Sequence, residues 1–233
     1  DPRDGFINRD GLKGPKDLPK GATVGTASLR RESQTLAMRP DLKIVTFRGN
    51  VQTRLKKLDD GLADATYLAM AGLNRLGMAH VATPVPITEM VPAAGQGIVA
   101  IAARPDDLDQ DVLDLIHQLN HPATRLAAMA ERAFLVELDG SCRTAMGGHA
   151  WQEDGVWKFA GEVLKPDGSH RWAFQGVAQG DASETKVGDW EPLLEERQKF
   201  WRRLREGQNG GRRHRKYRGG RKTTYWILGD RSN

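Results

Sequence analysis

The strongest constraint on the fold is the alternation of strand-like and helix-like segments between Thr23 and about Leu76. Short apolar runs predict strands, and each is followed by a stretch that predicts a helix. The predicted strands are TVGT, KIVTF and ADATYLAMA, and the predicted helices are SLRRESQTLAMR, NVQTRLKKLDDG and GLNRLG. Strands that alternate with helices through brief loops form a mostly parallel sheet, so this region predicts an α/β domain.

The following part of the chain has a different pattern. PAAGQGIVAIAAR predicts a glycine turn and a buried strand, and DQDVLDLIHQLN and HPATRLAAMAERAFLVELDG predict two helices. In the longer helix Leu126, Ala130, Phe134 and Leu138 fall on one face. EDG and PDG then separate strand-like runs and are typical of hairpin turns. We therefore expect a smaller α+β domain with a three-stranded antiparallel sheet.

The positive charge of the protein is concentrated at its C-terminal end. The chain carries a formal charge of +5, but residues 191–233 contain 13 Lys and Arg against 5 Asp and Glu. The first 190 residues therefore contain 22 basic and 25 acidic groups, a net charge of −3. The Arg/Gly-rich tail is predicted to be disordered. Nucleic-acid binding through residues 202–222 is an alternative function, although a solvated tail is favoured and the folded body would take no part in such binding.

Cys142 is the only cysteine, so the chain cannot form an internal disulfide, and a reducing, cytoplasmic setting is expected. It lies in the polar stretch ELDGSCRTAMGG, where a thiol is accessible. Without further context, a loop thiol with no function is the simpler interpretation. No apolar run approaches the roughly 18 residues that span a bilayer, and no His or Cys pair has metal-ligand spacing.

Five arginines follow predicted strands at the same end of the sheet: Arg30, Arg31, Arg48, Arg54 and Arg75. Arg30 and Arg31 fall in the first turn of a predicted helix, where the macrodipole opposes a cation by about 0.3–1 kcal/mol. An anionic ligand would remove this conflict, because both the helix N–H groups and the guanidinium groups bind it. Any single arginine is more simply a solvated surface residue. The set of five predicts a polycarboxylate or phosphate site.

Six motifs together resemble the porphobilinogen deaminase (hydroxymethylbilane synthase) family of tetrapyrrole biosynthesis, over about residues 1–189. The motifs, in family order and at family spacing, are VGTASLRRESQ, LKIVTFRGNVQTRLKKLDDG, DATYLAMAGLNRLG, PAAGQGIVAI, HPATRLAAMAERAFL and LDGSCRTAMGGHA. The resemblance implies a periplasmic-binding-protein-like α/β domain beside the smaller α+β domain. It also implies a cytoplasmic, monomeric transferase of haem biosynthesis. This enzyme would condense four porphobilinogen units, with loss of ammonia, into hydroxymethylbilane.

The resemblance assigns roles to the residues singled out above. Cys142 is expected to carry a dipyrromethane cofactor through a thioether, and this cofactor primes the reaction. Ser28, Arg30 and Arg31 are expected to hold the carboxylates of the cofactor. Arg48, Arg54 and Arg75 are expected to serve both cofactor and substrate, and Gln96 is expected to lie near the substrate.

The resemblance also divides the chain into parts. Residues 1–20 are expected to be a remnant of a first domain and its crossover, 21–92 an α/β domain with an arginine-lined cleft, and 93–108 a segment returning to the first domain. Residues 109–189 are expected to form the α+β domain that carries the cysteine, and 190–233 an atypical basic tail.

The resemblance places the catalytic aspartate of the family, which handles pyrrole-nitrogen protons, upstream of Asp1. We therefore expect an N-terminally truncated chain that contains no catalytic residue and is inactive alone. A non-catalytic anion-binding module on the same α/β scaffold is the alternative.

Overall fold

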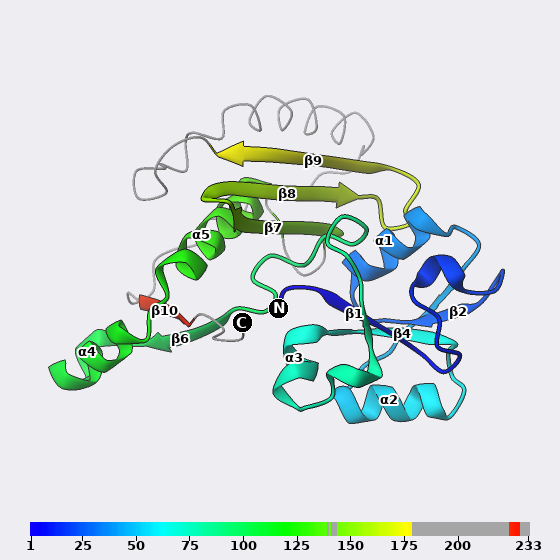
Figure 1. The fold of residues 1–233 in the computed structure, drawn as a ribbon, viewed down its shortest axis with the longest axis horizontal. Helices are drawn as coiled ribbons and strands as arrows, with labels where there is room; N and C mark the ends of the chain where they lie inside the picture. Colours follow the sequence, from blue (N-terminus) through cyan, green and yellow to red (C-terminus); the bar gives the residue numbers. More distant parts are fainter. Residues whose placement is uncertain (139, 141–143, 179–223, 229–233) are drawn as a thin grey trace, which may run out of the picture.

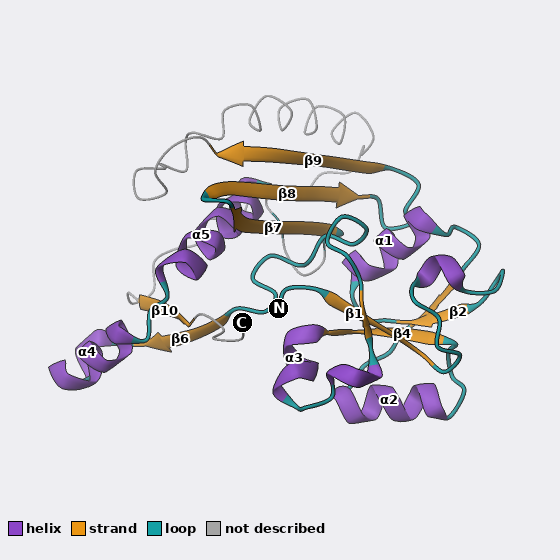
Figure 2. Cartoon of the chain, in the orientation of Figure 1, coloured by secondary structure: helices purple, strands orange, loops and turns teal. Residues whose placement is uncertain are grey.

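The structure is a computed structural model that describes residues 1–138, 140, 144–178 and 224–228. Within these residues a five-stranded sheet, a three-stranded sheet and a two-stranded sheet are present (Figure 1). Helix α1 (Leu29–Met38) lies between the five-stranded and the three-stranded sheets (Figure 2). None of the helices in this described part has the length and apolar character needed to cross a membrane.

The five-stranded sheet has the strand order β3-β2-β4-β1-β5. Its strands are β1 (Asp4–Asn8), β2 (Thr23–Gly25), β3 (Lys43–Val45), β4 (Ala65–Ala69) and β5 (Thr83–Pro84). Strand β2 pairs in parallel with β3 and β4, whereas β1 pairs antiparallel with β4 and β5. The sheet is therefore mixed, and its α/β character confirms the predicted fold class.

Helices cover both faces of this sheet. Helix α1 lies on one face, and α2 (Val51–Asp59) and α3 (Met70–Arg75) lie on the other (Figure 1). Successive side chains of a strand point to opposite faces, so Phe6 of β1 joins the core cluster on the α1 side and Ile7 joins the cluster with Leu58 of α2. A strand buried on both faces has no polar alternation, which is typical of the centre of an α/β sheet.

The sequence-based division placed residues 1–20 outside this domain, but the structure puts Asp4–Asn8 between β4 and β5. The pairing of Asp4 with Ala69 and of Asn8 with Ala65 joins segments far apart in the chain. The run DGFIN contains only two large apolar residues, too few to show a period. Only its long-range pairing identifies it as a central strand.

The predicted three-stranded antiparallel sheet is confirmed. Its strands are β7 (Met146–Glu153), β8 (Val156–Leu164) and β9 (Arg171–Ala178), in the order β7-β8-β9. Glu153 pairs with Val156 across the two-residue loop Asp154–Gly155, in which both residues have positive φ, 51° and 77°. This is the primed turn that Asp-Gly favours in a tight hairpin. Helix α5 (Pro122–Glu137) packs on this sheet through Phe134, whose ring lies 5.4 Å from that of Phe159.

Two expectations for the remaining elements were wrong. Strand β6 (Val99–Ala103) was predicted to be buried, but Val99 is 49% exposed. Residues 190–233 were predicted to be disordered, but β10 (Thr224–Leu228) pairs antiparallel with β6. The run TYWIL is rich in aromatic and β-branched residues, which favour strands and can pair with an open edge. The other residues of the tail, including the basic stretch 202–222, lie outside the described residues.

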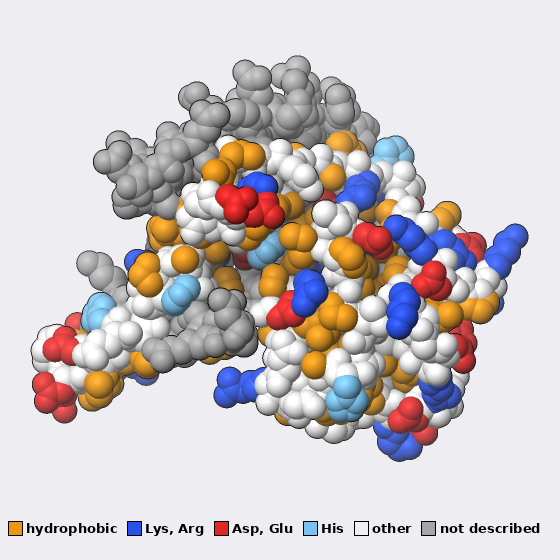
Figure 3. Space-filling model, viewed as in Figure 1, with side chains coloured by type: hydrophobic (Ala, Val, Ile, Leu, Met, Phe, Trp, Pro, Cys, Tyr) orange, Lys and Arg blue, Asp and Glu red, His pale blue; other side chains and the backbone are white. Residues whose placement is uncertain are grey.

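Helix α4 (Gln110–Gln118) follows β6 and exposes apolar side chains, including Val112 and Leu115. Figure 3 shows hydrophobic side chains at the surface of this part of the molecule. The alternation of helix and strand thus predicts the elements well, while the exposure of β6 and α4 depends on what packs against them.

Candidate anion-binding site

The first turn of α1 brings two arginines into the interior. The Ser28 side chain caps the helix by accepting a hydrogen bond from the backbone N–H of Arg31. The cap starts the helix at the carboxyl end of β2, and the helix then packs across the sheet. Arg30 and Arg31 are consequently buried, with 4% and 7% of their surface exposed. They are not the solvated surface residues that the sequence alone left as an alternative.

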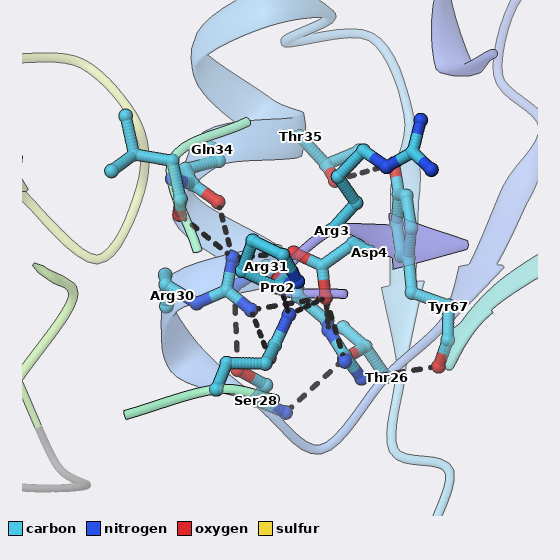
Figure 4. A network of polar contacts seen from close by, with 12 residues as sticks. Pro2, Arg3, Asp4, Thr26, Ser28, Arg30, Arg31, Gln34, Thr35 and Tyr67 are labelled. Atoms are coloured by element: carbon cyan, nitrogen blue, oxygen red, sulfur yellow. Dashed lines mark hydrogen bonds and ion pairs between the residues drawn. The ribbon is translucent and has the colours of Figure 1, made fainter. Parts of the chain in front are cut away.

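A buried carboxylate from β1 faces both arginines (Figure 4). Asp4 is fully buried, and its Oδ2 lies 2.7 Å from Nη1 of Arg30. Its Oδ1 lies 2.7 Å from Nη2 of Arg31 and accepts from Nε of Arg31 at 2.9 Å. In this structure the anion expected at the start of α1 is therefore, at least in part, a side chain of the protein itself.

The three groups influence one another's ionisation. Burial by itself raises the pKa of Asp4, but the charges and hydrogen bonds of Arg31 and Arg30 outweigh burial and hold the pKa below its ordinary value. Burial lowers the pKa of Arg31; Asp4 opposes this shift, and the neighbouring charges of Arg30 and Arg54 add to it. Two arginines and one aspartate leave one positive charge, and Arg54 adds a second nearby. The site therefore keeps an excess of positive charge.

Gln96 belongs to the same network. It lies in a turn between Gly95 and Gly97, and its Oε1 accepts from Nη2 of Arg30 at 3.3 Å. Its Nε2 donates to Oδ1 of Asp4 at 3.1 Å and to the carbonyl of Pro2 at 2.7 Å. The glycine turn predicted from the sequence therefore places its glutamine against the paired arginines.

One N–H group of the Arg30 guanidinium is not used by the hydrogen bonds within the described residues. Its Nη1 donates to the Gln34 side chain and to the Val91 carbonyl, each at 3.0 Å, in addition to Asp4. Its Nε is buried and has no hydrogen-bond partner among the described residues. Because a buried, unpaired N–H is costly, this atom indicates where an additional acceptor would be favourable.

The glycine turn is held in place from the α5 side. Oε2 of the buried Glu131 accepts from the backbone N–H of Gly95 at 2.6 Å, and its Oε1 accepts from that of Ala150 at 2.9 Å. This carboxylate therefore connects α5, β7 and the turn that carries Gln96.

The two glycines of the turn are predicted to differ in their tolerance of a side chain. Both have positive φ, 77° at Gly95 and 84° at Gly97, but a Cβ at Gly97 would lie 2.7 Å from the carbonyl oxygen of Asp1, whereas space is open at Gly95. Gly95→Ala should lower the free energy of unfolding by about 1 kcal/mol, the conformational cost of a non-glycine residue in this region. Gly97→Ala should lower it further, because the backbone of Asp1 or of the turn must move to admit the Cβ. Urea denaturation of both variants measures the difference. Equal losses would contradict the close approach of Asp1.

The remaining predicted residues are less closely joined. Arg54 lies near the start of α2, donates from Nε to the carbonyl of Gly49 at 2.9 Å and influences Arg31 electrostatically. Arg48 is exposed in the loop before α2, and Arg75 is exposed in the last turn of α3. Within the described ranges, neither guanidinium has an acceptor. Cys142 lies outside the described residues.

Sequence reasoning missed Asp4 and Gln34. Asp4 was hidden because β1 was not predicted, and Gln34 is one helical turn after Arg30, on the face where its amide can contact the guanidinium. That spacing is a signal the sequence does contain. In the described ranges no group of three or more His, Cys, Asp or Glu side chains is arranged to hold a metal ion.

Comparison with known proteins identifies the family of this chain. A family model described as porphobilinogen deaminase, dipyromethane cofactor binding domain, matches residues 1–111, and one for the porphobilinogen deaminase C-terminal domain matches residues 125–188. The chain belongs to the porphobilinogen deaminase family.

Relatives named porphobilinogen deaminase support the same conclusion. The protein of Paracoccus denitrificans is 47% identical over 193 residues, covering 81% of this chain and 61% of that protein. The protein of Nitrobacter winogradskyi is 51% identical over 154 residues, covering 66% and 48%. That of Phenylobacterium zucineum is 47% identical over 180 residues, covering 77% and 55%. The chain therefore spans about half the length of the curated relatives it matches.

Proposed function

We propose that this chain supplies the cofactor-binding part of a hydroxymethylbilane synthase, a transferase of tetrapyrrole and haem biosynthesis. The enzyme condenses four porphobilinogen units into hydroxymethylbilane with loss of ammonia. The observation that carries the proposal is the buried Arg30–Arg31 pair, which keeps excess positive charge even with Asp4 bound. Family membership and the names of the relatives support it. Monomeric action in the cytoplasm belongs to the same proposal.

The residues present fit a dipyrromethane in charge and in hydrogen bonding. Each pyrrole bears an acetate and a propionate, so the cofactor is a polyanion. Nε of Arg30 has no hydrogen-bond partner in the part of the chain that the structure describes. This donor, the second positive charge from Arg54 and the N-terminus of α1 are all favourable for carboxylates. Ser28, Arg30 and Arg31 hold this group in our proposal, and Cys142 attaches it through a thioether. When bound, the dipyrromethane supplies the pyrrole carbon onto which the new units are joined.

The side chains of this chain bind and orient rather than move protons. Guanidinium groups that are buried act in a medium of low dielectric constant, so each contact with a carboxylate is stronger than at the surface. Gln96 stays next to Arg30 and can adjust to the substrate, and Arg48, Arg54 and Arg75 serve the carboxylates of cofactor and incoming units. Asp4 has a lowered pKa and therefore stays ionised near neutral pH, which suits an acceptor and not a proton donor.

The test is to compare this chain with the same chain joined to the N-terminal part of the Paracoccus denitrificans relative. Both proteins are incubated with porphobilinogen, assayed for hydroxymethylbilane and weighed intact. We expect product and an added mass of two pyrrole units only for the joined protein. A joined protein that is folded but carries no such mass and forms no product would overturn the proposal.

Arg54 offers a quantitative prediction. In the joined protein Arg54→Leu should raise KM for porphobilinogen or lower cofactor content, because one charge-assisted contact of about 1.5–3 kcal/mol is lost. That range corresponds to a roughly 10- to 150-fold weaker interaction. Arg9→Leu is the control, since Arg9 is exposed and forms only a surface ion pair with Asp59. If both variants behave alike, Arg54 has no part in the site.

The alternative functions have less support. A non-catalytic anion-binding module would keep the arginine site without turnover, and the joined protein distinguishes it from the enzyme. Nucleic-acid binding rests on residues 202–222 alone, which lie outside the described residues.

A further inference from the structure

A second buried carboxylate lies outside the arginine site, on the three-stranded sheet. Glu162 of β8 is fully buried, and neighbouring side chains of a strand point to opposite faces. Val163 packs in the cluster with Phe134 of α5, so Glu162 points the other way, toward α1. A buried charge persists only where it is paired and hydrogen-bonded, so the contacts of this carboxylate need an explanation.

Glu162 is held between two donors. Its Oε2 accepts from Nε of Arg171 at 2.7 Å, and Nη2 of the same arginine lies 2.7 Å from that oxygen. Its Oε1 accepts from Nε2 of Gln34 on α1. The Arg171 side chain is 41% exposed, whereas Gln34 is buried. Glu162 therefore joins a partly solvated cation on β9 to an amide that contacts the arginine site.

The orientation of the Gln34 amide follows from these contacts. Its NH₂ group faces two acceptors that cannot donate, the carboxylate of Glu162 and the carbonyl of Val91 at 2.9 Å. Its oxygen must then face the other way, where it accepts from Nη1 of Arg30 at 3.0 Å. A flipped amide would set its NH₂ group against the guanidinium. The acceptor on Glu162 thus helps to decide that Gln34 presents an oxygen to Arg30.

The same surface docks the hairpin onto α1. The hydroxyl of Ser33 donates to the carbonyl of Pro166 in the β8–β9 turn at 3.0 Å. At Gly168 in that turn a Cβ would lie 2.4 Å from the backbone nitrogen of Ala37, so the two backbones are in close contact. Glu162 is therefore part of a continuous interface between the three-stranded sheet and the helix that carries Arg30 and Arg31 (Figure 1).

We propose that Glu162 is a positioning residue for the anion site. Its carboxylate oxygen fixes the amide of Gln34, and Gln34 in turn fixes the guanidinium of Arg30. The three-stranded sheet thereby contributes to the geometry of the arginine pair, although no described residue of this sheet forms a hydrogen bond with the Arg30 side chain. The effect on cofactor binding rests on the function proposed above, whereas the order of the Gln34 amide does not.

The test compares two neutral replacements of similar size, Glu162→Gln and Glu162→Met. Both remove the negative charge and release Arg171 into solvent, but only the glutamine keeps an oxygen that can accept from Gln34. In the joined protein we expect the Gln variant to keep cofactor content and KM close to those of the parent. The Met variant should bind porphobilinogen about threefold to tenfold more weakly, the effect of one neutral hydrogen bond. Glu153→Gln, on the exposed end of β7, is the matched control.

A second measurement needs no cofactor. Exchange of the Gln34 side-chain NH₂ protons with solvent, followed by NMR in the 233-residue chain, should be slow in the parent and in Glu162→Gln. It should be at least about tenfold faster in Glu162→Met, because the released amide opens more often. Urea denaturation of each variant verifies that it is folded before the comparison is made.

The outcomes separate the two proposals. If porphobilinogen binding and protection of the Gln34 amide are weakened in the Met variant alone, the positioning role is supported. Equal loss in both variants would show that the charge or the packing matters instead, and no loss in either would show that Glu162 does not act on Arg30; either result overturns the inference. If the parent takes up no cofactor, the proposed function fails, and the exchange measurement still decides the role of Glu162. Rapid exchange of the Gln34 amide in the parent itself would overturn the inference without any variant.

Discussion

Asp4→Asn should lower the free energy of unfolding by about 3–5 kcal/mol at neutral pH, the range for breaking a buried ion pair by removing one partner. The two buried guanidinium groups would lose their shared carboxylate, and neither can reach water easily. Urea denaturation of the 233-residue chain measures the loss. Because the variant keeps the size of the side chain, the loss reports charge and hydrogen bonding more than packing.

The pH dependence of this loss of stability follows from the direction in which the pKa of Asp4 is shifted. The folded-state pKa of Asp4 lies below its ordinary value of 3.8. The ionised Asp4 therefore contributes its full stabilisation to the folded protein when the pH is above that ordinary value. It is lost as the pH falls through the folded-state pKa. The difference in stability between the parent and Asp4→Asn should therefore be constant above about pH 5 and narrow at more acidic pH.

Asp60→Asn is the control for this experiment. Asp60 forms an exposed ion pair with Lys56 on α2, 2.9 Å apart, and such pairs contribute little. We expect its denaturation midpoint to stay close to that of the parent. Two results would contradict the contribution of Asp4, Arg30 and Arg31 to stability. One is a stability difference between the parent and Asp4→Asn that does not change with pH, and the other is a loss of stability in Asp4→Asn no larger than that in Asp60→Asn.

Cys142→Ala should abolish the covalent group entirely. In the joined protein the parent is expected to carry the mass of two pyrrole units, and the variant none, because Cys142 is the only thiol that these 233 residues supply. Product formation should be lost with it, since no primer remains on the protein. Intact mass spectrometry gives the result directly.

The reactivity of the thiol provides the control. A cysteine already joined to carbon by a thioether cannot react with iodoacetamide, so Cys142 of the loaded parent should stay unlabelled under denaturing conditions. In a parent prepared without the group, Cys142 should take up a label, which peptide mass spectrometry locates. Retention of the two-pyrrole mass by Cys142→Ala would show that the attachment lies elsewhere and that the role carried over from the family is wrong.

The structure also changes how one obvious experiment is understood. The pair Arg30 and Arg31 invites replacement by leucine to test anion binding. Because Asp4 is buried against both, the double variant would leave a carboxylate without a partner and destabilise the protein in addition to weakening the site. Replacement of Arg54, which is only partly buried, tests the site with less damage to the fold.

The local elements could be predicted from the sequence because their signals are local. The apolar spacing of α5 and the Asp154–Gly155 turn each depend on residues within a few positions of one another. Arg30 and Arg31 could be placed in the first turn of a helix for a similar reason, since they come shortly after a predicted strand. The family motifs added the expected role of Cys142, which no local pattern provides.

Only the tertiary structure decided which groups meet. Asp4 reaches Arg30 and Arg31 because β1 inserts beside β4, and Glu162 reaches Gln34 because the β8–β9 hairpin docks on α1. The exposure of β6, and its pairing with the distant residues of β10, were decided in the same way. The physical reason is that burial and charge pairing are properties of residues brought together across long stretches of chain. A carboxylate in the sequence is identical whether water or two guanidinium groups will surround it, and only packing determines which.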